Sequence, residues 1–196
     1  MKIYFTSALL AVALLLQVAS NAQTYSKAKY GVYLSADDFM HNKLSYAFET
    51  ENHKNKLILH NIFGSSRIEI VNNDNKKSLE KKDIYGYRDN GVDHRLMNNE
   101  DFLIVDTSDF LMYGQTHETR LMKWQVQKQT SYYFSLTANS KIEPLTKSNI
   151  ENALSYNKEF DHYLNTTFKS DGDLAEYNKR VKKYEIKYLY EEYEKR

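Results

Sequence analysis

Pairs of carboxylate side chains that lie close together in the sequence are the first residues in this chain that could do chemistry. The pairs are Asp37 with Asp38, Glu49 with Glu51, Asp106 with Asp109 and Asp171 with Asp173, and Glu118 is a further single candidate. A glycosidase uses two carboxyl groups at a fixed separation across a cleft. Because spacing along the chain does not define a cleft, these acids keep open one alternative, a small secreted hydrolase that acts on glycans or peptides.

Other catalytic and cofactor motifs are missing from the sequence. The six histidines include no pair at metal-ligand spacing, and there is no cysteine to bind zinc or to act as a nucleophile. The sequence Gly64-Ser65-Ser66 does not match the Gly-x-Ser-x-Gly turn of serine hydrolases, and no glycine-rich phosphate loop is present. Asp171 and Asp173 are better explained as helix caps than as a calcium loop. We therefore predict no catalytic residue, no metal site and no cofactor.

Tyrosine is unusually frequent, with 17 residues against nine Phe and one Trp. A tyrosine can bury its ring while its hydroxyl stays hydrated or bonded, so half-buried sheet and helix faces are the interpretation that we favour. The alternative is a binding face for carbohydrate or peptide, which requires aromatic rings that are exposed together. For that alternative the candidate binding residues are Tyr85, Tyr87, His94 and Trp124.

The clearest local signal surrounds Asn90-Gly91. Asn-Gly is the preferred two-residue type I′ turn, because both residues tolerate positive φ. Folding about this turn pairs Tyr87 with His94 on an apolar face, where we expect His94 to bond a tyrosine hydroxyl. It also pairs Arg88 with Asp93 on the opposite, exposed face, where such a pair contributes a few tenths of a kcal/mol.

The elements that must position these residues change character near Pro144. Before it the hydrophobic residues alternate, and after it they recur every three to four residues. Strands are expected at residues 30–34, 57–63 and 67–70, in the hairpin at 83–96, and at 102–105, 110–113, 121–126 and 131–136. Short connections between strands favour antiparallel pairing. We therefore predict an α+β fold: an antiparallel β-sheet or partly closed barrel of about eight strands, followed by two C-terminal helices.

Two helices are expected after Pro144. Thr146 and Ser148 are candidate N-caps of the first helix, which extends to Phe168. The second helix is predicted from an apolar and tyrosine seam at Leu174, Tyr177, Val181, Tyr184 and Tyr188. We favour packing of this seam on the sheet, and a weak homodimer through the last helix is a further hypothesis.

The first 22 residues have the pattern of a secretory signal peptide. Lys2 gives a positive start, residues 8–16 are apolar, and Ser20-Asn21-Ala22 places small residues before a cleavage site. The apolar run is shorter than the roughly 20 residues that span a bilayer. The expected organisation is a signal peptide at 1–22, an antiparallel β domain at 23–144 and a C-terminal helical arm that packs on the sheet at 145–196.

Composition argues against several classes of partner. Removal of residues 1–22 takes away Lys2 and leaves 27 − 1 = 26 basic residues against 26 acidic ones. A net charge near zero argues against nucleic-acid binding and against a polybasic membrane anchor. The missing cysteine excludes a disulfide framework and an acyl-cysteine anchor. We expect an exported protein of the periplasm or the cell exterior, with no stable membrane anchor after cleavage.

Three short motifs carry a resemblance to known proteins. They are Gly31-Val32-Tyr33-Leu34 with Asp38-Phe39, Asp83-Ile84-Tyr85-Gly86-Tyr87 with Gly91, and Leu145-Thr146-Lys147-Ser148-Asn149. In this order they resemble motifs of small exported proteins of unknown function from Bacteroidetes, where a signal ending in Ala-Gln, like Ala22-Gln23, is common. Tyr85 stands where that group frequently has Trp. The resemblance implies export and no particular activity.

From these residues we expect an exported, non-catalytic binding or cell-envelope accessory protein, whose partner is an unknown protein or glycan. We base this expectation on the patterns that indicate strands, turns and helix caps, and on the lack of a recognisable catalytic motif in the sequence. The alternative is the small secreted hydrolase, which would use carboxylates of the sheet. We favour binding and leave the question of catalysis open.

Overall fold

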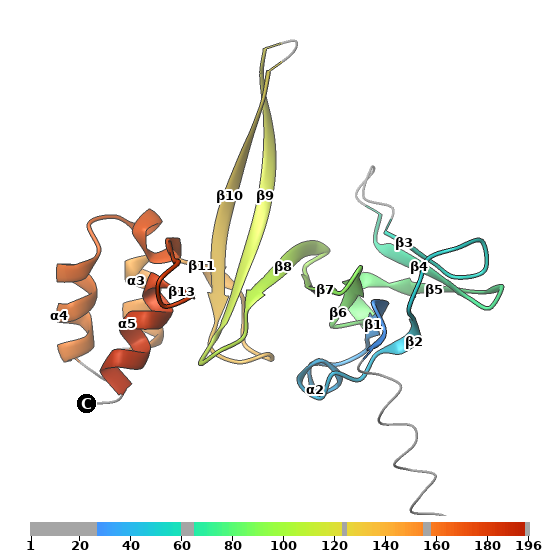
Figure 1. Cartoon of the computed structure of the whole chain (residues 1–196), viewed down its shortest axis with the longest axis horizontal. Coiled ribbons are helices and arrows are strands. Elements are labelled where there is room, and N and C mark those ends of the chain that lie inside the picture. Colours follow the sequence, from blue (N-terminus) through green and yellow to red (C-terminus); the bar gives the residue numbers. More distant parts are fainter. Residues whose placement is uncertain (1–26, 60–64, 123–124, 155–157, 195–196) are drawn as a thin grey trace, which may run out of the picture. The chain divides into compact units, whose positions relative to one another are not determined.

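The chain divides into two compact units, residues 1–100 and residues 101–196. A computed structural model of the 196-residue chain describes residues 27–59, 65–122, 125–154 and 158–194 (Figure 1). The predicted boundary at Pro144 falls inside the second unit, and the predicted signal peptide lies outside the described residues.

The main sheet has eight antiparallel strands, in the order β11-β10-β9-β8-β7-β6-β1-β2. Its strands are β1 (Tyr30–Tyr33), β2 (Ser45–Phe48), β6 (Gly86–Asp89), β7 (Val92–Met97), β8 (Glu100–Asp106), β9 (Leu111–Met122), β10 (Gln125–Ser135) and β11 (Glu143–Pro144). The order has two ends, so the sheet is open and not a closed barrel. The predicted α+β class, with an eight-stranded antiparallel sheet followed by helices, is confirmed.

The N-terminal unit adds a short helix and a second sheet. Helix α2 (Ala36–Met40) begins at an N-cap, because Ser35 Oγ accepts a hydrogen bond from the Asp38 backbone N–H at 3.1 Å. The second sheet has the order β3-β4-β5. Its strands are β3 (Lys56–Ile58), β4 (Arg67–Asn72) and β5 (Asn75–Glu80), and a 3₁₀ turn, η3 (Lys81–Asp83), follows. Strands β2 and β5 were not predicted, since neither has an apolar alternation.

The hairpin β6–β7 has the predicted register. Tyr87 pairs with His94 and Arg88 with Asp93, and the turn residues Asn90 and Gly91 have φ of 47° and 83°. On one face of this hairpin, Tyr87 joins the core of the N-terminal unit. That core consists of Val32, Phe48, Ile68, Ile70, Ile84, Tyr87 and Leu96.

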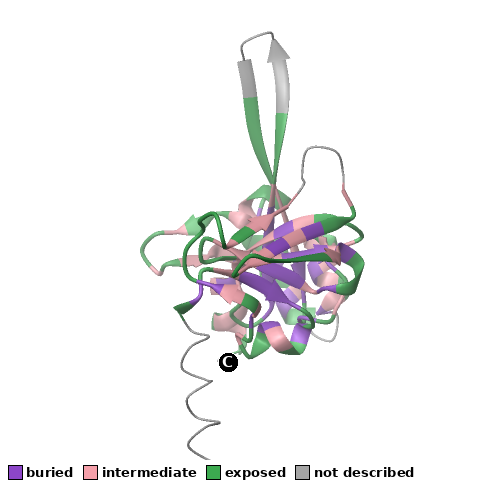
Figure 2. Ribbon diagram, turned by 90° about the vertical axis from the view of Figure 1, so that its right-hand side faces the viewer, coloured by how far each residue is buried: buried purple, intermediate pink, exposed green. Residues whose placement is uncertain are grey.

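The long hairpin β9–β10 corrects two predictions. Residues 121–126 are not one strand, because β9 ends at Met122 and β10 begins at Gln125, and these two residues pair with each other. Residues 127–130, which lie between the strands predicted at 121–126 and 131–136, are therefore part of β10. Residues such as Thr116 and Thr130 are polar, and no apolar residues alternate with them. The sequence therefore does not indicate a strand there. Figure 2 shows this part of the hairpin as exposed.

The C-terminal region contains three α-helices and a small hairpin. The elements are α3 (Lys147–Ala153), α4 (Lys158–Thr167), η4 (Asp171–Ala175), β12 (Tyr177–Asn178), β13 (Lys183–Tyr184) and α5 (Glu185–Glu194). The prediction of a helix from Leu174 was wrong. The Asn178 side chain accepts hydrogen bonds from the Arg180 and Val181 backbone N–H groups, and this turn competes with helix. A homodimer through the last helix thereby loses the seam on which it was based.

The helices pack on one face of β9 and β10, and Figure 1 shows α3, α4 and α5 together beside this hairpin. The core of the C-terminal unit joins Phe110, Met112 and Phe134 to apolar side chains of the helical region. These are Leu145, Ile150, Leu154, Phe160, Leu164, Phe168, Leu174 and Ile186. This packing fixes α3 next to the end of β10, where the candidate site lies.

Candidate functional site

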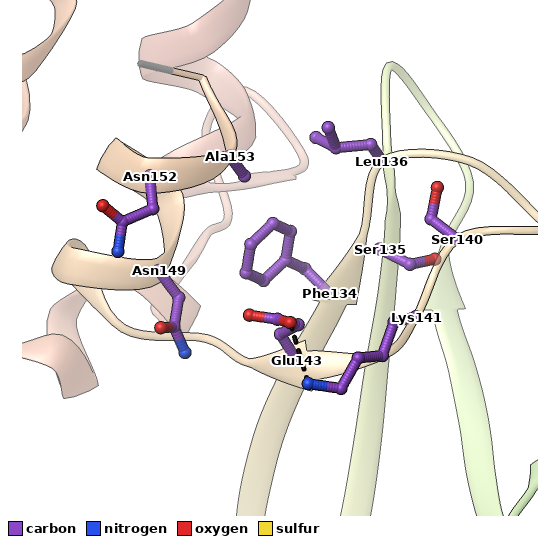
Figure 3. Close-up of a pocket in the computed structure, with 9 residues that line it drawn as sticks. All are labelled: Phe134, Ser135, Leu136, Ser140, Lys141, Glu143, Asn149, Asn152 and Ala153. Carbon is purple, nitrogen blue, oxygen red and sulfur yellow. Dashed lines mark hydrogen bonds and ion pairs between the residues drawn. The ribbon is translucent and has the colours of Figure 1, made fainter.

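A pocket of ≈ 320 Å³ lies between the end of β10, the connection to β11, and helix α3. We call it the α3 pocket. Its lining residues are Phe134, Ser135, Leu136, Ser140, Lys141, Glu143, Asn149, Asn152 and Ala153. Figure 3 shows Phe134 in the middle, the α3 residues on one side and Ser140 and Lys141 on the other. The volume is at the small end of the range for ligand sites, roughly 300–1,000 Å³.

The floor of the α3 pocket is part of the hydrophobic core. The Phe134 side chain is 2% exposed, and its ring lies edge-on to that of Phe110 with centroids 6.0 Å apart. Next to it, Ser135 Oγ is within hydrogen-bond distance of the Tyr113 hydroxyl, at 2.8 Å, and donates to the Thr137 carbonyl at 2.9 Å. The floor is therefore fixed by close packing, and the Ser135 hydroxyl has a structural role.

Side-chain amides from α3 form one wall of the pocket. Thr146 caps this helix by accepting from the Asn149 backbone N–H at 3.1 Å, as predicted. Asn149 Nδ2 donates to the Pro144 carbonyl at 2.9 Å, which leaves its amide oxygen as an acceptor. Asn152 is one turn further on and exposed, so both amides lie on the same face of the helix.

An ion pair forms the opposite part of the rim. Lys141 Nζ donates to Glu143 Oε1 at 3.0 Å, and the two side chains are 76% and 40% exposed. Such exposed pairs contribute about 0–1 kcal/mol, so the two groups can turn toward a ligand at little cost. These are the two charged residues of the lining, and their charges cancel.

Three of the carboxylates singled out in the sequence are hydrogen-bond acceptors, and Asp106 also lies 3.7 Å from the Lys187 ammonium group. Asp106 Oδ1 accepts from the Ser108 backbone N–H at 2.8 Å, and Asp171 Oδ1 accepts from that of Lys147 at 2.8 Å. Asp173 forms a capping box with Ser170, whose hydrogen bonds lower the pKa of the Asp173 carboxyl. A general acid needs the opposite shift.

The structure describes three of the four predicted binding residues, and Tyr87 and His94 lie together. Tyr87 is 2% exposed, and its ring stacks on that of His94 with centroids 4.6 Å apart. Tyr85 precedes β6 and packs elsewhere, with its ring 5.3 Å from that of Phe39 and below the Arg95 guanidinium. Trp124 lies outside the described residues.

The opposite face of the β6–β7 hairpin contains a network that sequence analysis found only in part. The predicted Arg88–Asp93 pair is bidentate, at 2.7 and 2.9 Å, and half-buried instead of exposed. The buried Tyr33 hydroxyl donates to Asp93 at 3.0 Å, and burial with the nearby Asp93 raises the pKa of Tyr33. Its partner is 60 residues away, so no local signal could indicate this contact.

A buried lysine supports the C-terminal unit and was missed entirely. Lys187 on α5 is 0% exposed, and its ammonium group donates to the carbonyls of Ser108 and Phe110. Its Nζ lies 3.6 Å from the centroid of the Phe110 ring, and burial lowers the pKa of Lys187 to about 8. Because Phe110 packs on Phe134, Lys187 helps to position the floor of the α3 pocket.

Comparison of the chain with protein-family models, with curated proteins and with solved structures found no match. Among the described residues, no cluster of three or more His, Asp or Glu side chains could hold a metal ion. In the same part of the chain, no helix combines the length and the apolar character needed to cross a membrane.

Proposed function

We propose that this chain is an exported binding protein, and that the α3 pocket holds a neutral, hydroxyl-rich ligand such as one unit of a glycan. The observation that carries the proposal is the lining of this pocket. An apolar floor at Phe134 is combined with amides at Asn149 and Asn152 and a hydroxyl at Ser140. Ligand sites have this composition, in which apolar area supplies affinity and a few polar groups supply orientation.

The charge of the pocket favours a neutral ligand. Lys141 and Glu143 neutralise each other, so neither an anion nor a cation meets an unopposed charge. The amides of Asn149 and Asn152 can both donate and accept, and sugar hydroxyl groups need partners of both kinds. A peptide also presents both hydrogen-bond donors and acceptors, but the small volume of the pocket fits a single compact unit better than an extended chain.

Binding is better supported here than hydrolysis. A glycosidase requires two carboxyl groups around the scissile bond, and the α3 pocket is lined by one, Glu143. That carboxylate is also engaged by Lys141. The hydrolase alternative has no observation of its own among the described residues.

Titration with neutral trisaccharides tests the proposed function. Maltotriose, cellotriose and chitotriose are each titrated calorimetrically into the purified protein. We expect at least one of them to bind, and Asn152→Ala to weaken that binding about three- to tenfold, the range for one neutral hydrogen bond. The matched control is Gln129→Ala, which removes an exposed amide from β10 outside the pocket and leaves the affinity unchanged.

Three results would contradict the proposal. The first is that none of the sugars binds, and the second is that the Asn152→Ala variant binds as well as the wild type. The third is that a sugar is cleaved and that Glu143→Gln abolishes the cleavage. The last result would favour the hydrolase instead.

Export is a separate part of the proposal, supported by the pattern of residues 1–22. We expect a cell expressing the whole chain to release a product that begins at Gln23. Cell fractionation and N-terminal sequencing check this. A chain that is retained in the cytoplasm with residues 1–22 intact would contradict it.

A further inference from the structure

A second pocket, in the N-terminal unit, is built around an exposed tyrosine with an unusual backbone. Strands β1 and β2 pair Tyr30 with Phe48 and Val32 with Ser45, so two residues of β2, Tyr46 and Ala47, oppose the single residue Gly31. This arrangement is a β-bulge. Tyr46 lies in the left-handed region, with φ of 55°, and its side chain is 37% exposed.

The left-handed position of such a bulge normally belongs to glycine, because a Cβ is strained there. The chain next to the bulge approaches Gly31 closely, since a Cβ on Gly31 would lie 3.1 Å from both the Leu44 Cβ and the Ser45 carbonyl oxygen. The chain therefore keeps a tyrosine where glycine would relieve strain. Strain of this kind is concentrated at functional sites, and bulges often redirect a side chain toward one.

The surroundings of Tyr46 are polar and held by backbone contacts. The pocket has a volume of ≈ 380 Å³ and is lined by Tyr46, Asn72, Asn73, Asn75, Lys76 and Lys77. We call it the Tyr46 pocket. Asn72 Nδ2 donates to the Ala47 carbonyl at 3.3 Å, which ties the β4–β5 hairpin to the bulge. The Asn73 backbone N–H donates to the Asn55 side chain at 2.9 Å, which fixes the turn.

The charges of the Tyr46 pocket differ from those of the α3 pocket. Lys76 pairs with Glu69 at 2.7 Å, and at the turn Lys54 lies 3.9 Å from Asp74. Lys77 is exposed and has no ion-pair partner among the residues that the structure describes. The lining itself contains two lysines and no carboxylate. The pocket therefore presents a net positive charge beside an aromatic ring.

We propose that the Tyr46 pocket binds an acidic sugar unit: the Tyr46 ring packs against the sugar, the asparagine amides bond its hydroxyls, and Lys77 pairs with its carboxylate. An aromatic ring offers a flat apolar surface to the C–H face of a sugar. Asparagine amides both donate and accept, as sugar hydroxyls require. The unpaired lysine selects a sugar that carries a negative charge.

Calorimetric titration with trigalacturonate tests this proposal, and its neutral methyl ester is the matched probe. We expect the acid to bind the full chain, and to bind about tenfold more tightly than the ester at low salt. Tyr46→Ala and Tyr46→Gly should both reduce affinity by about tenfold or more, whereas Tyr46→Phe keeps the ring and stays within about threefold. We expect Tyr46→Gly to be the more stable of the two ring-deleted variants, because glycine tolerates the positive φ of 55°, so a loss of binding in this variant is not explained by backbone strain.

A charge-matched pair of variants tests the role of Lys77. Lys77→Gln should weaken trigalacturonate binding about three- to tenfold. Lys179→Gln removes the same charge from an exposed site outside both pockets and should leave this binding unchanged. The proposal is overturned if the acid does not bind, if the ester binds equally well, or if Tyr46→Gly binds like the wild type. Binding that depends on Lys77 but not on Tyr46 would mean attraction to surface charge only. None of these results depends on the α3 pocket.

Discussion

The α3 pocket and the Tyr46 pocket both combine an apolar group with side-chain amides, but they differ in the burial of the apolar group and in the charge of the lining. In the α3 pocket the apolar group is Phe134, 2% exposed and packed in a core, and the charges at the rim cancel. In the Tyr46 pocket the apolar group is an exposed ring on a strained bulge, and the lining is positive. The group proposed to contact the ligand therefore stabilises the fold in the first pocket, whereas in the second it occupies a strained backbone position that lowers stability.

The largest effect that this comparison predicts is in the α3 pocket. Phe134→Ala removes a buried ring from the core, so we expect the free energy of unfolding to fall by about 3–5 kcal/mol. Neutral-sugar binding should be lost together with it. Urea unfolding followed by tyrosine fluorescence measures the change. A loss below about 1 kcal/mol would mean that the floor is not part of the core.

The pH dependence of stability tests the role of Lys187, which contacts Phe110 next to Phe134. Lys187 has a pKa of about 8 in the folded chain and 10.5 as its ordinary value. Between these values the unfolded chain binds more protons than the folded one, so stability rises with pH in this window. We expect a rise on the order of 1–2 kcal/mol from pH 8 to 9.5, measured by urea unfolding.

The rise should disappear in Lys187→Met and persist in Lys179→Met, which changes an exposed lysine of the same unit. Above pH 10 the slope should reverse, because burial raises the pKa of Tyr33 and Tyr184 and the unfolded chain then loses its phenolic protons first. An equal rise in Lys187→Met would show that another group is responsible.

A smaller effect is predicted at the strained bulge. Tyr46→Gly and Tyr46→Ala both remove the ring, but only glycine relieves the positive φ of 55°. We expect the glycine variant to be more stable than the alanine variant by about 1 kcal/mol. Paired denaturation curves give this difference directly. Equal stabilities would mean that position 46 is not strained, and the contrast between the pockets would weaken.

The smallest effect concerns the ion pair at the α3 rim. Lys141→Ala should change the free energy of unfolding by less than about 0.5 kcal/mol, because both partners are exposed to solvent. The same thermal or urea measurement checks this. A loss above about 1 kcal/mol would show that the pair is structural and not free to turn toward a ligand.

The parts of the fold that were predicted depend on local chemistry. The type I′ turn at Asn90-Gly91 fixed the register of β6 and β7, and the Thr146 cap fixed the start of α3. The helix predicted from Leu174 failed because the Asn178 side chain forms a turn that the hydrophobic spacing does not reveal.

Neither pocket could be predicted, for different physical reasons. The α3 pocket joins residues of β10, β11 and α3 that share no motif, and it exists only because α3 packs beside the end of β10. The strain at Tyr46 results from the register shift of β2 opposite Gly31, which sequence spacing does not indicate. Among the residues chosen for binding, Tyr87 and His94 do lie together, but the Tyr87 ring is buried in the core.

The most direct test of the central claim is a map of backbone amide chemical shifts, recorded while a neutral trisaccharide is added to the isotope-labelled protein. We expect shifts at residues 140–143 and 149–153, and smaller shifts in Asn152→Ala at the same sugar concentration. The claim would be contradicted if maltotriose, cellotriose and chitotriose all left these amide shifts unchanged, or if they shifted only amides outside the α3 pocket.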